Sequence, residues 1–202
     1  MTVWFTADTH FGHAGARTLY RRPFPTTAEM DAAMAARWNE VVGPGDTVWH
    51  LGDFALRMTP EAAGALLDGL HGRKHLVTGN NDPPAIAALP GWASVQAYAE
   101  LELDDVRLVL CHYAFRTWNG MAKGALNLHG HSHGRLRRGR LGLPARHAGD
   151  PPHRRRPAAR GANGPGRDRS SGLIATRAAG AHGTITCSAG GHDAHRPHRL
   201  RA

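Results

Sequence analysis

Five short apolar segments within residues 1–134 each end at a group of residues that can bind metal ions. The segments have the length and apolar character of buried strands, and a glycine or a polar turn follows most of them. Strand ends collect at one edge of an open sheet, so these groups are expected to lie close together. They are Asp8-Thr9-His10, Gly52-Asp53, Gly79-Asn80-Asn81-Asp82, Cys111-His112 and Gly130-His131-Ser132-His133.

The second group has the most constrained sequence around it. Residues 48–51 form a buried strand pattern that runs into Gly52, where the chain can turn sharply without a side chain in the way. Asp53 is therefore displayed at the tip of a rigid strand. A carboxylate that is central to such a set is the natural bridge between two metal ions.

Strand patterns and helix patterns alternate along residues 1–134. Thr26 to Glu29 fits a capping box, and Thr59 followed by Pro60 fits a second helix start. Asp104 and Asp105 lie between two strand patterns and predict a hairpin. The predicted strands are residues 3–7, 46–51, 74–77, 98–103, 106–110 and 125–129. This order predicts an α/β fold with its site at the carboxyl ends of strands.

The net charge of +9 is divided unevenly along the chain. Residues 1–134 hold 10 Lys and Arg against 13 Asp and Glu, whereas residues 135–202 hold 15 Arg and 3 Asp, which gives −3 and +12. The second part has no Phe, Trp, Tyr, Val or Met and cannot bury enough apolar surface to offset its ordering entropy. We therefore predict two parts, a folded domain at residues 1–134 and a disordered tail at residues 135–202.

The tail suggests two further hypotheses. Its arginines would attract nucleic acid without sequence preference, since no aromatic residue is present to stack on bases. Its Arg, Ala, Gly, Pro and His content also resembles a GC-rich coding region read in a shifted frame, which comparison of the other two frames of the gene would test.

Asp, Asn and His supply oxygen and nitrogen donors, which suit Mn, Fe, Zn or Mg. Two such ions about 3.5–4 Å apart can clamp a phosphate ester and lower the pKa of a water molecule. The sequence therefore predicts two divalent metal ions, with Mn favoured, and a phosphate-ester substrate.

The order Asp-x-His, Gly-Asp, Gly-Asn-x-Asp, strand-end His and Gly-His-x-His resembles the calcineurin-like metallophosphoesterase superfamily. Residues 5–13 and 129–133 are similar to its small bacterial and phage members. The resemblance implies an α/β/β/α sandwich of two mixed sheets. It also implies an enzyme in which a metal-bound hydroxide hydrolyses a phosphoric ester. A phosphodiester is the favoured substrate.

The same resemblance implies roles for individual residues. Asp8, His10 and His133 would hold one ion, Asn80, His112 and His131 the other, and Asp53 would bridge them. The residues implied to act in catalysis are Asp53, Asn81, His112 and His131.

Asn81 stands where the family pattern usually has a His that assists the leaving group or the transition state. Asn can donate a hydrogen bond but cannot transfer a proton at neutral pH. His13 and His50 are the alternatives as proton donors, each equally compatible with a structural role. Two other functions stay open, an inactive metal-binding remnant and a nonspecific nucleic-acid-binding protein.

No run of about 18 apolar residues occurs, so no membrane partner is expected. The strand pattern at the N-terminus, without the basic region of a signal peptide, and the presence of only two cysteines predict a cytoplasmic protein. The sequence makes no prediction of oligomeric state.

Overall fold

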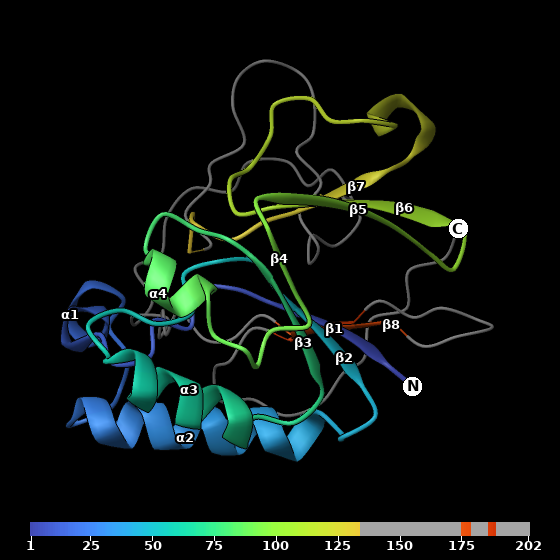
Figure 1. Ribbon diagram of the computed structural model, residues 1–202. Coiled ribbons are helices and arrows are strands. Elements are labelled where there is room, and N and C mark those ends of the chain that lie inside the picture. The colour runs from blue at the N-terminus through green and yellow to red at the C-terminus, as the bar shows by residue number, and fades with distance from the viewer. Residues whose placement is uncertain (134–174, 179–185, 189–202) are drawn as a thin grey trace, which may run out of the picture.

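Two sheets and a layer of helices form the described part of the protein in the computed structural model (Figure 1). The structure describes residues 1–133 and, as backbone only, residues 175–178 and 186–188. The larger sheet has the order β4-β3-β2-β1-β8-β9, and the smaller sheet has the order β5-β6-β7. The prediction of a mixed α/β fold with two sheets and helices is thus confirmed.

Four neighbouring parallel strands, β4 to β1, form one side of the larger sheet, and two antiparallel strands follow next to β1. In sheet order they are β4 (Ser94–Gln96), β3 (Arg73–Val77), β2 (Thr47–His50), β1 (Val3–Thr6), β8 (Ala175–Ala178) and β9 (Thr186–Ser188). In register, Thr6 pairs with His50 and His50 with Leu76, so β1, β2 and β3 end at the same edge.

The smaller sheet contains the predicted hairpin and one parallel strand. The hairpin joins β5 (Tyr98–Leu103) to β6 (Val106–Cys111), and β7 (Leu126–Leu128) lies parallel to β6 after a 3-10 turn at Met121–Lys123. Asp104 and Asp105 have φ of 49° and 62°, the left-handed values of a tight two-residue hairpin turn.

The helices are α1 (Ala14–Leu19), α2 (Thr27–Val41), α3 (Pro60–Gly69) and α4 (Pro84–Ala87). Both predicted helix starts are confirmed, because the hydroxyls of Thr26 and Thr59 accept hydrogen bonds from the backbone N–H groups of Glu29 and Ala62. Helices on the outer face of the smaller sheet, which a four-layer sandwich would also have, are not among the described residues.

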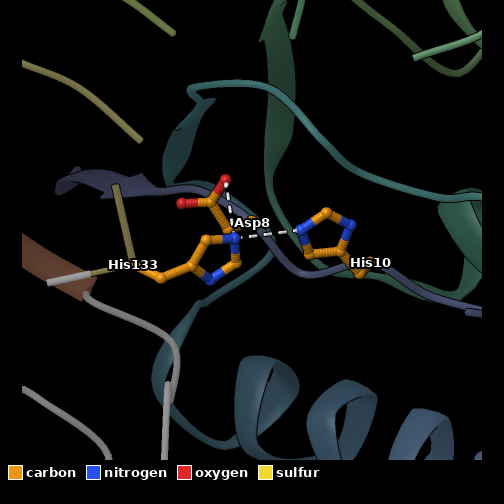
Figure 2. A group of neighbouring side chains, drawn as sticks. All are labelled: Asp8, His10 and His133. Atoms are coloured by element: carbon orange, nitrogen blue, oxygen red, sulfur yellow. Dashed lines mark hydrogen bonds and ion pairs between the residues drawn. The ribbon is translucent and has the colours of Figure 1, made fainter. Parts of the chain in front are cut away.

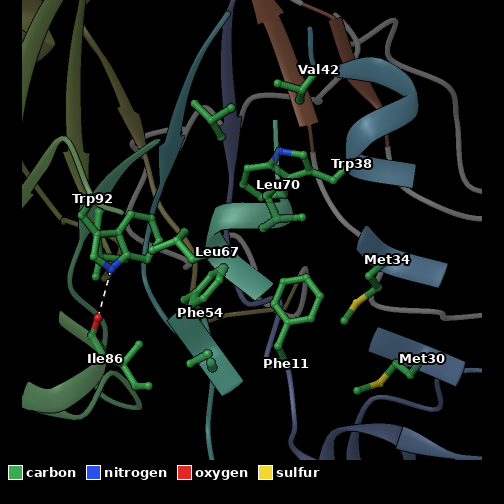
Figure 3. Packing of buried hydrophobic residues seen from close by; sticks show 14 residues of the cluster. Phe11, Met30, Met34, Trp38, Val42, Phe54, Leu67, Leu70, Ile86 and Trp92 are labelled. Carbon is green, nitrogen blue, oxygen red and sulfur yellow. Dashed lines mark hydrogen bonds between the residues drawn. The ribbon is translucent and has the colours of Figure 1, made fainter. Parts of the chain in front are cut away.

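Successive side chains of the central strands point to opposite faces of the larger sheet, where two separate cores lie. Val48 and Leu76 face the helices, where Trp38 and Leu67 are buried in one cluster (Figure 3). Trp49 belongs to the second cluster, which lies between the two sheets and contains buried residues of β1, β2, β3, β5, β6 and β7. The central sheet is therefore covered on both faces, as a parallel sheet requires.

The sequence did not predict β8 and β9, because both lie within residues 135–202, which it predicted as a disordered tail. The structure instead pairs β8 with β1 over Val3 to Phe5. Strand pairing uses backbone N–H and C=O groups, which a segment poor in large apolar residues still supplies. The rest of the predicted disordered tail lies outside the described residues, and the boundary at residue 134 stays a prediction.

No helix among the described residues is both long and apolar enough to cross a bilayer.

Leu67 of α3 is fully buried against the central sheet, so Leu67→Ala should lower the free energy of unfolding by about 2–5 kcal/mol. Urea denaturation measures the change. The matched variant Leu66→Ala removes a side chain that is only half-buried in the same helix and should cost less. Equal losses in the two variants would contradict the assigned orientation of α3.

Candidate metal centre

The ends of β1 and β2 bring the first two groups of candidate ligands together. The backbone N–H groups of Asp8 and His10 donate to the carbonyl oxygens of Gly52 and Asp53, both at 2.9 Å. Gly52 has a φ of +89°, a conformation that side chains rarely adopt. The two loops therefore run beside each other and place Asp8, His10 and Asp53 at one edge of the sheet.

A left-handed backbone is shared by five of the seven candidate ligands. Asp8, His10, Asp53, His131 and His133 have φ between 45° and 62°. Such values are uncommon outside glycine and disfavoured for most side chains, and they concentrate at functional sites. Here they turn successive side chains toward one point.

Asp8, His10 and His133 form the first compact group, with one ligand atom of each lying within 4.8 Å of the others. Figure 2 shows one nitrogen of the His133 ring facing both the Asp8 carboxylate and the His10 ring. The His133 Nε2 atom is 3.3 Å from His10 Nε2 and 3.8 Å from Asp8 Oδ1. Two imidazole nitrogens this close repel each other unless a proton or a cation lies between them, so the group fits a divalent metal ion.

Asp8, Asp53 and His112 form the second compact group. The His112 Nε2 atom is 3.5 Å from Asp53 Oδ1 and 3.1 Å from Asn80 Oδ1. Its other ring nitrogen, Nδ1, lies 2.8 Å from the carbonyl oxygen of Leu51. A hydrogen bond to that carbonyl places the proton on Nδ1 and leaves Nε2 free to bind a metal.

The buried carboxylate of Asp53 belongs to the second group and also lies close to His10 of the first. Its Oδ2 atom is 3.7 Å from His10 Nε2, and its Oδ1 atom is the one that faces His112. One oxygen thus faces each group, which is the arrangement that a bridging carboxylate needs. Asp8 also reaches both groups, which the sequence did not predict.

Asn81 is positioned by Asp53. Its backbone N–H donates to Asp53 Oδ1 and its side-chain Nδ2 donates to Asp53 Oδ2, both at 2.8 Å. Asp82 ties the same two turns together, because its carboxylate accepts hydrogen bonds from the backbone N–H groups of Asp53, Phe54 and Gly79.

His131 is placed differently from the other candidate ligands. Its backbone N–H donates to Asp8 Oδ1 at 3.1 Å, and its ring lies 5.2 Å from the His112 ring. The residue is exposed and belongs to neither compact group of the described residues. The structure therefore brings six of the seven predicted ligands together and leaves the seventh at the rim.

The two alternative proton donors have different surroundings. His50 is fully buried, and its Nε2 atom lies 2.9 Å from the hydroxyl of Thr9, which itself donates to the carbonyl oxygen of Phe54. This arrangement makes His50 a structural support of the first loop. His13 is half-buried, and its ring lies 5.7 Å from the His10 ring, so it is the alternative that stays close to the site.

Two residues close to the site were not singled out in the sequence. Arg22 is buried and donates to the carbonyl oxygens of Asp8 and Thr9, and the Tyr20 ring stacks on the His133 ring. Both lie directly after α1. Nothing in the local sequence distinguishes a buried arginine from an exposed one.

Burial has opposite consequences for two neighbouring candidate ligands. It raises the pKa of the Asp8 carboxyl from 3.8 to about 6 and lowers the pKa of His10 from 6.5 to about 4. Near pH 5, the metal-free site therefore holds a protonated Asp8 beside a neutral His10.

We expect the Asp8 carboxyl of the metal-free protein to titrate near pH 6, as measured by ¹³C NMR with Asp8→Asn to assign the signal. A cation must displace this proton, so metal affinity should rise with pH between about 5 and 7. His10, which is neutral throughout that range, contributes nothing to the rise. A midpoint near 3.8 would contradict the buried setting of Asp8.

Comparison with known proteins gives a match to one family. Residues 1–153 match the calcineurin-like phosphoesterase superfamily domain, past the predicted boundary at residue 134. The chain is 31% identical over 170 residues to the Gene 66 protein of Mycobacterium phage D29, covering 70% of this chain and 83% of the relative. It is 28% identical over 132 residues to an uncharacterized protein of Methanocaldococcus jannaschii, covering 65% and 69% of the two chains.

A solved structure shows the same fold. A protein of unknown function from Aquifex aeolicus aligns with a TM-score of 0.54 and 24% identity, covering 70% of this chain and 82% of that one. The family match spans most of the chain and includes every candidate ligand. The chain therefore belongs to the calcineurin-like phosphoesterase superfamily.

Proposed function

We propose that the protein is a phosphoesterase that uses two divalent metal ions, with Mn²⁺ favoured, to hydrolyse a phosphoric ester. The observation that carries the proposal is the Asp53 carboxylate, with one oxygen facing His10 and the other facing His112. Two ions held there would stabilise charge on the phosphoryl oxygens and lower the pKa of a water molecule.

The chain's own residues would hold the site in a fixed geometry. Hydrogen bonds from Asn81 orient both Asp53 oxygens, and the Leu51 carbonyl orients the His112 ring. His131, exposed beside His112, is available to donate a hydrogen bond to a phosphoryl oxygen. Donors held in place before the reaction stabilise developing charge without reorganising.

A phosphodiester with a good leaving group is the substrate class that we favour. Asn81 cannot transfer a proton at neutral pH, and its amide group already donates to Asp53. A departing alkoxide needs a proton, whereas a stable leaving group does not. Residue 81 thus supports Asp53 and gives no acid catalysis.

A nonspecific nucleic-acid-binding role for the arginine-rich residues 135–202 is the second candidate function, and their charge of +12 favours it. It predicts salt-sensitive binding that the Asp53→Asn variant retains. Hydrolysis that depends on added metal would separate the enzyme from this role and from an inactive metal-binding remnant.

Asp53→Asn should abolish hydrolysis of bis-para-nitrophenyl phosphate and weaken both metal sites. Loss of an outer hydrogen-bond partner alone costs about 10–100-fold in metal affinity, and loss of a shared ligand should cost at least as much. Elemental analysis and Mn²⁺ titration measure the effect. The exposed Asp68→Asn on α3 is the matched control and should behave as wild type. Two ions still bound, with unchanged rates, would refute the bridging role.

Asn81→His should raise turnover more for an alkyl phosphodiester than for a nitrophenyl one. General acid assistance is typically worth about 10²–10⁴-fold, and only the poor leaving group needs it. The backbone hydrogen bond from residue 81 to Asp53 is kept in the variant. Both substrates are compared at full metal occupancy. An equal effect on both would show that residue 81 does not govern leaving-group protonation.

A further inference from the structure

Arg22 is a buried cation that forms no ion pair among the described residues, and the Asp8 and Asp31 carboxylates act on it only at longer range. Its Nη1 and Nη2 atoms donate to the carbonyl oxygens of Thr9 and Asp8, at 2.6 and 2.7 Å. Its remaining neighbours include the Met30 and Met34 sulfur atoms of α2, each 3.5 Å from Nη1. Burial removes hydration from the guanidinium group, which costs free energy. The interactions that Arg22 makes with this loop must offset that cost.

The two carbonyl groups belong to the peptide units that join Asp8 to His10. Both of these residues have a left-handed backbone, with φ of 56° and 51°. The fork of the guanidinium group fixes both peptide planes at once, which a single point donor cannot do. On the other side of the loop, the N–H groups of Asp8 and His10 donate to the carbonyl oxygens of Gly52 and Asp53, in the turn that follows β2.

The same segment also contacts the third residue of the first compact group. The Tyr20 ring lies 3.7 Å from the His133 ring at an interplanar angle of 13°. The Arg22 guanidinium carbon lies 5.8 Å from the centre of the Tyr20 ring. The Tyr20 ring also stacks on the His10 ring, with ring centres 5.4 Å apart. Tyr20 and Arg22 together therefore contact all three members of the group that contains Asp8, His10 and His133.

We propose that Arg22 is a positioning residue for the metal site formed by Asp8, His10 and His133, an inference that rests on the proposed function. Two other roles for the cation predict different results. A purely structural role predicts lower stability with unchanged metal affinity. A purely electrostatic role predicts tighter metal binding after removal of the charge, because like charges repel.

The test is a titration of full-length protein with Mn²⁺, followed by the electron paramagnetic resonance signal of the free ion. Arg22→Met should bind one of two ions about 10–100-fold more weakly, the usual effect of losing an outer partner. Arg22→Lys keeps the charge but has a single donor nitrogen, so its affinity for the same ion should fall about 10-fold. Urea denaturation of each variant measures stability separately.

Lys74→Met is the matched control. Lys74 is also a buried cation that donates to a backbone carbonyl, that of Leu70 at 2.6 Å, and it lies near the start of β3, away from the strand end that precedes Asn80. The control should lose stability while both Mn²⁺ affinities stay at the wild-type value.

Wild-type affinity in a folded Arg22→Met, tighter binding in it, or an equal loss in Lys74→Met would each overturn the inference. If Arg22→Met does not fold, Arg22→Lys decides, and wild-type affinity in that variant overturns the inference. Absence of two Mn²⁺ sites in the wild-type protein would instead refute the proposed function, and the role of Arg22 with it.

Discussion

The parallel pairing of β1, β2 and β3 is the constraint on which the candidate site depends. The pairing register makes these strands end together, so the residues that follow them meet at one edge. The chain then turns through left-handed conformations at Asp8 and Asp53, which direct the side chains toward each other. Backbone hydrogen bonds between the turns hold that arrangement in place. The site is thus a consequence of sheet register followed by unusual local backbone geometry.

The second sheet completes the site, because its central strand β6 ends directly before His112. The Leu51 carbonyl, at the end of β2, is the hydrogen-bond partner of that histidine. Packing between the two sheets, around residues such as Trp49 and Leu110, therefore sets how far His112 lies from the ligands that follow β1 and β2. A substitution in this core should change the distance between the strand ends, and with it the positions of the metal ligands, since close-packed interiors transmit strain.

The sequence predicted the regular part of the fold, and the structure brings six of the seven predicted ligands together. The apolar strand patterns and the caps at Thr26 and Thr59 are local signals, and the structure confirms them. It did not predict the short α4, the edge strand β4, or β8, because short elements are fixed by tertiary pairing more than by local sequence. Nor did it single out Arg22, whose burial depends on packing against α2.

The central claim is that Asp53 lies between two metal ions at this edge of the sheet. Anomalous diffraction from crystals grown with Mn²⁺ tests it most directly. The account predicts two peaks, one among Asp8, His10, His133 and Asp53, and the other among Asp53, Asn80 and His112. A single peak, or peaks that lie beyond bonding distance of Asp53, would contradict it.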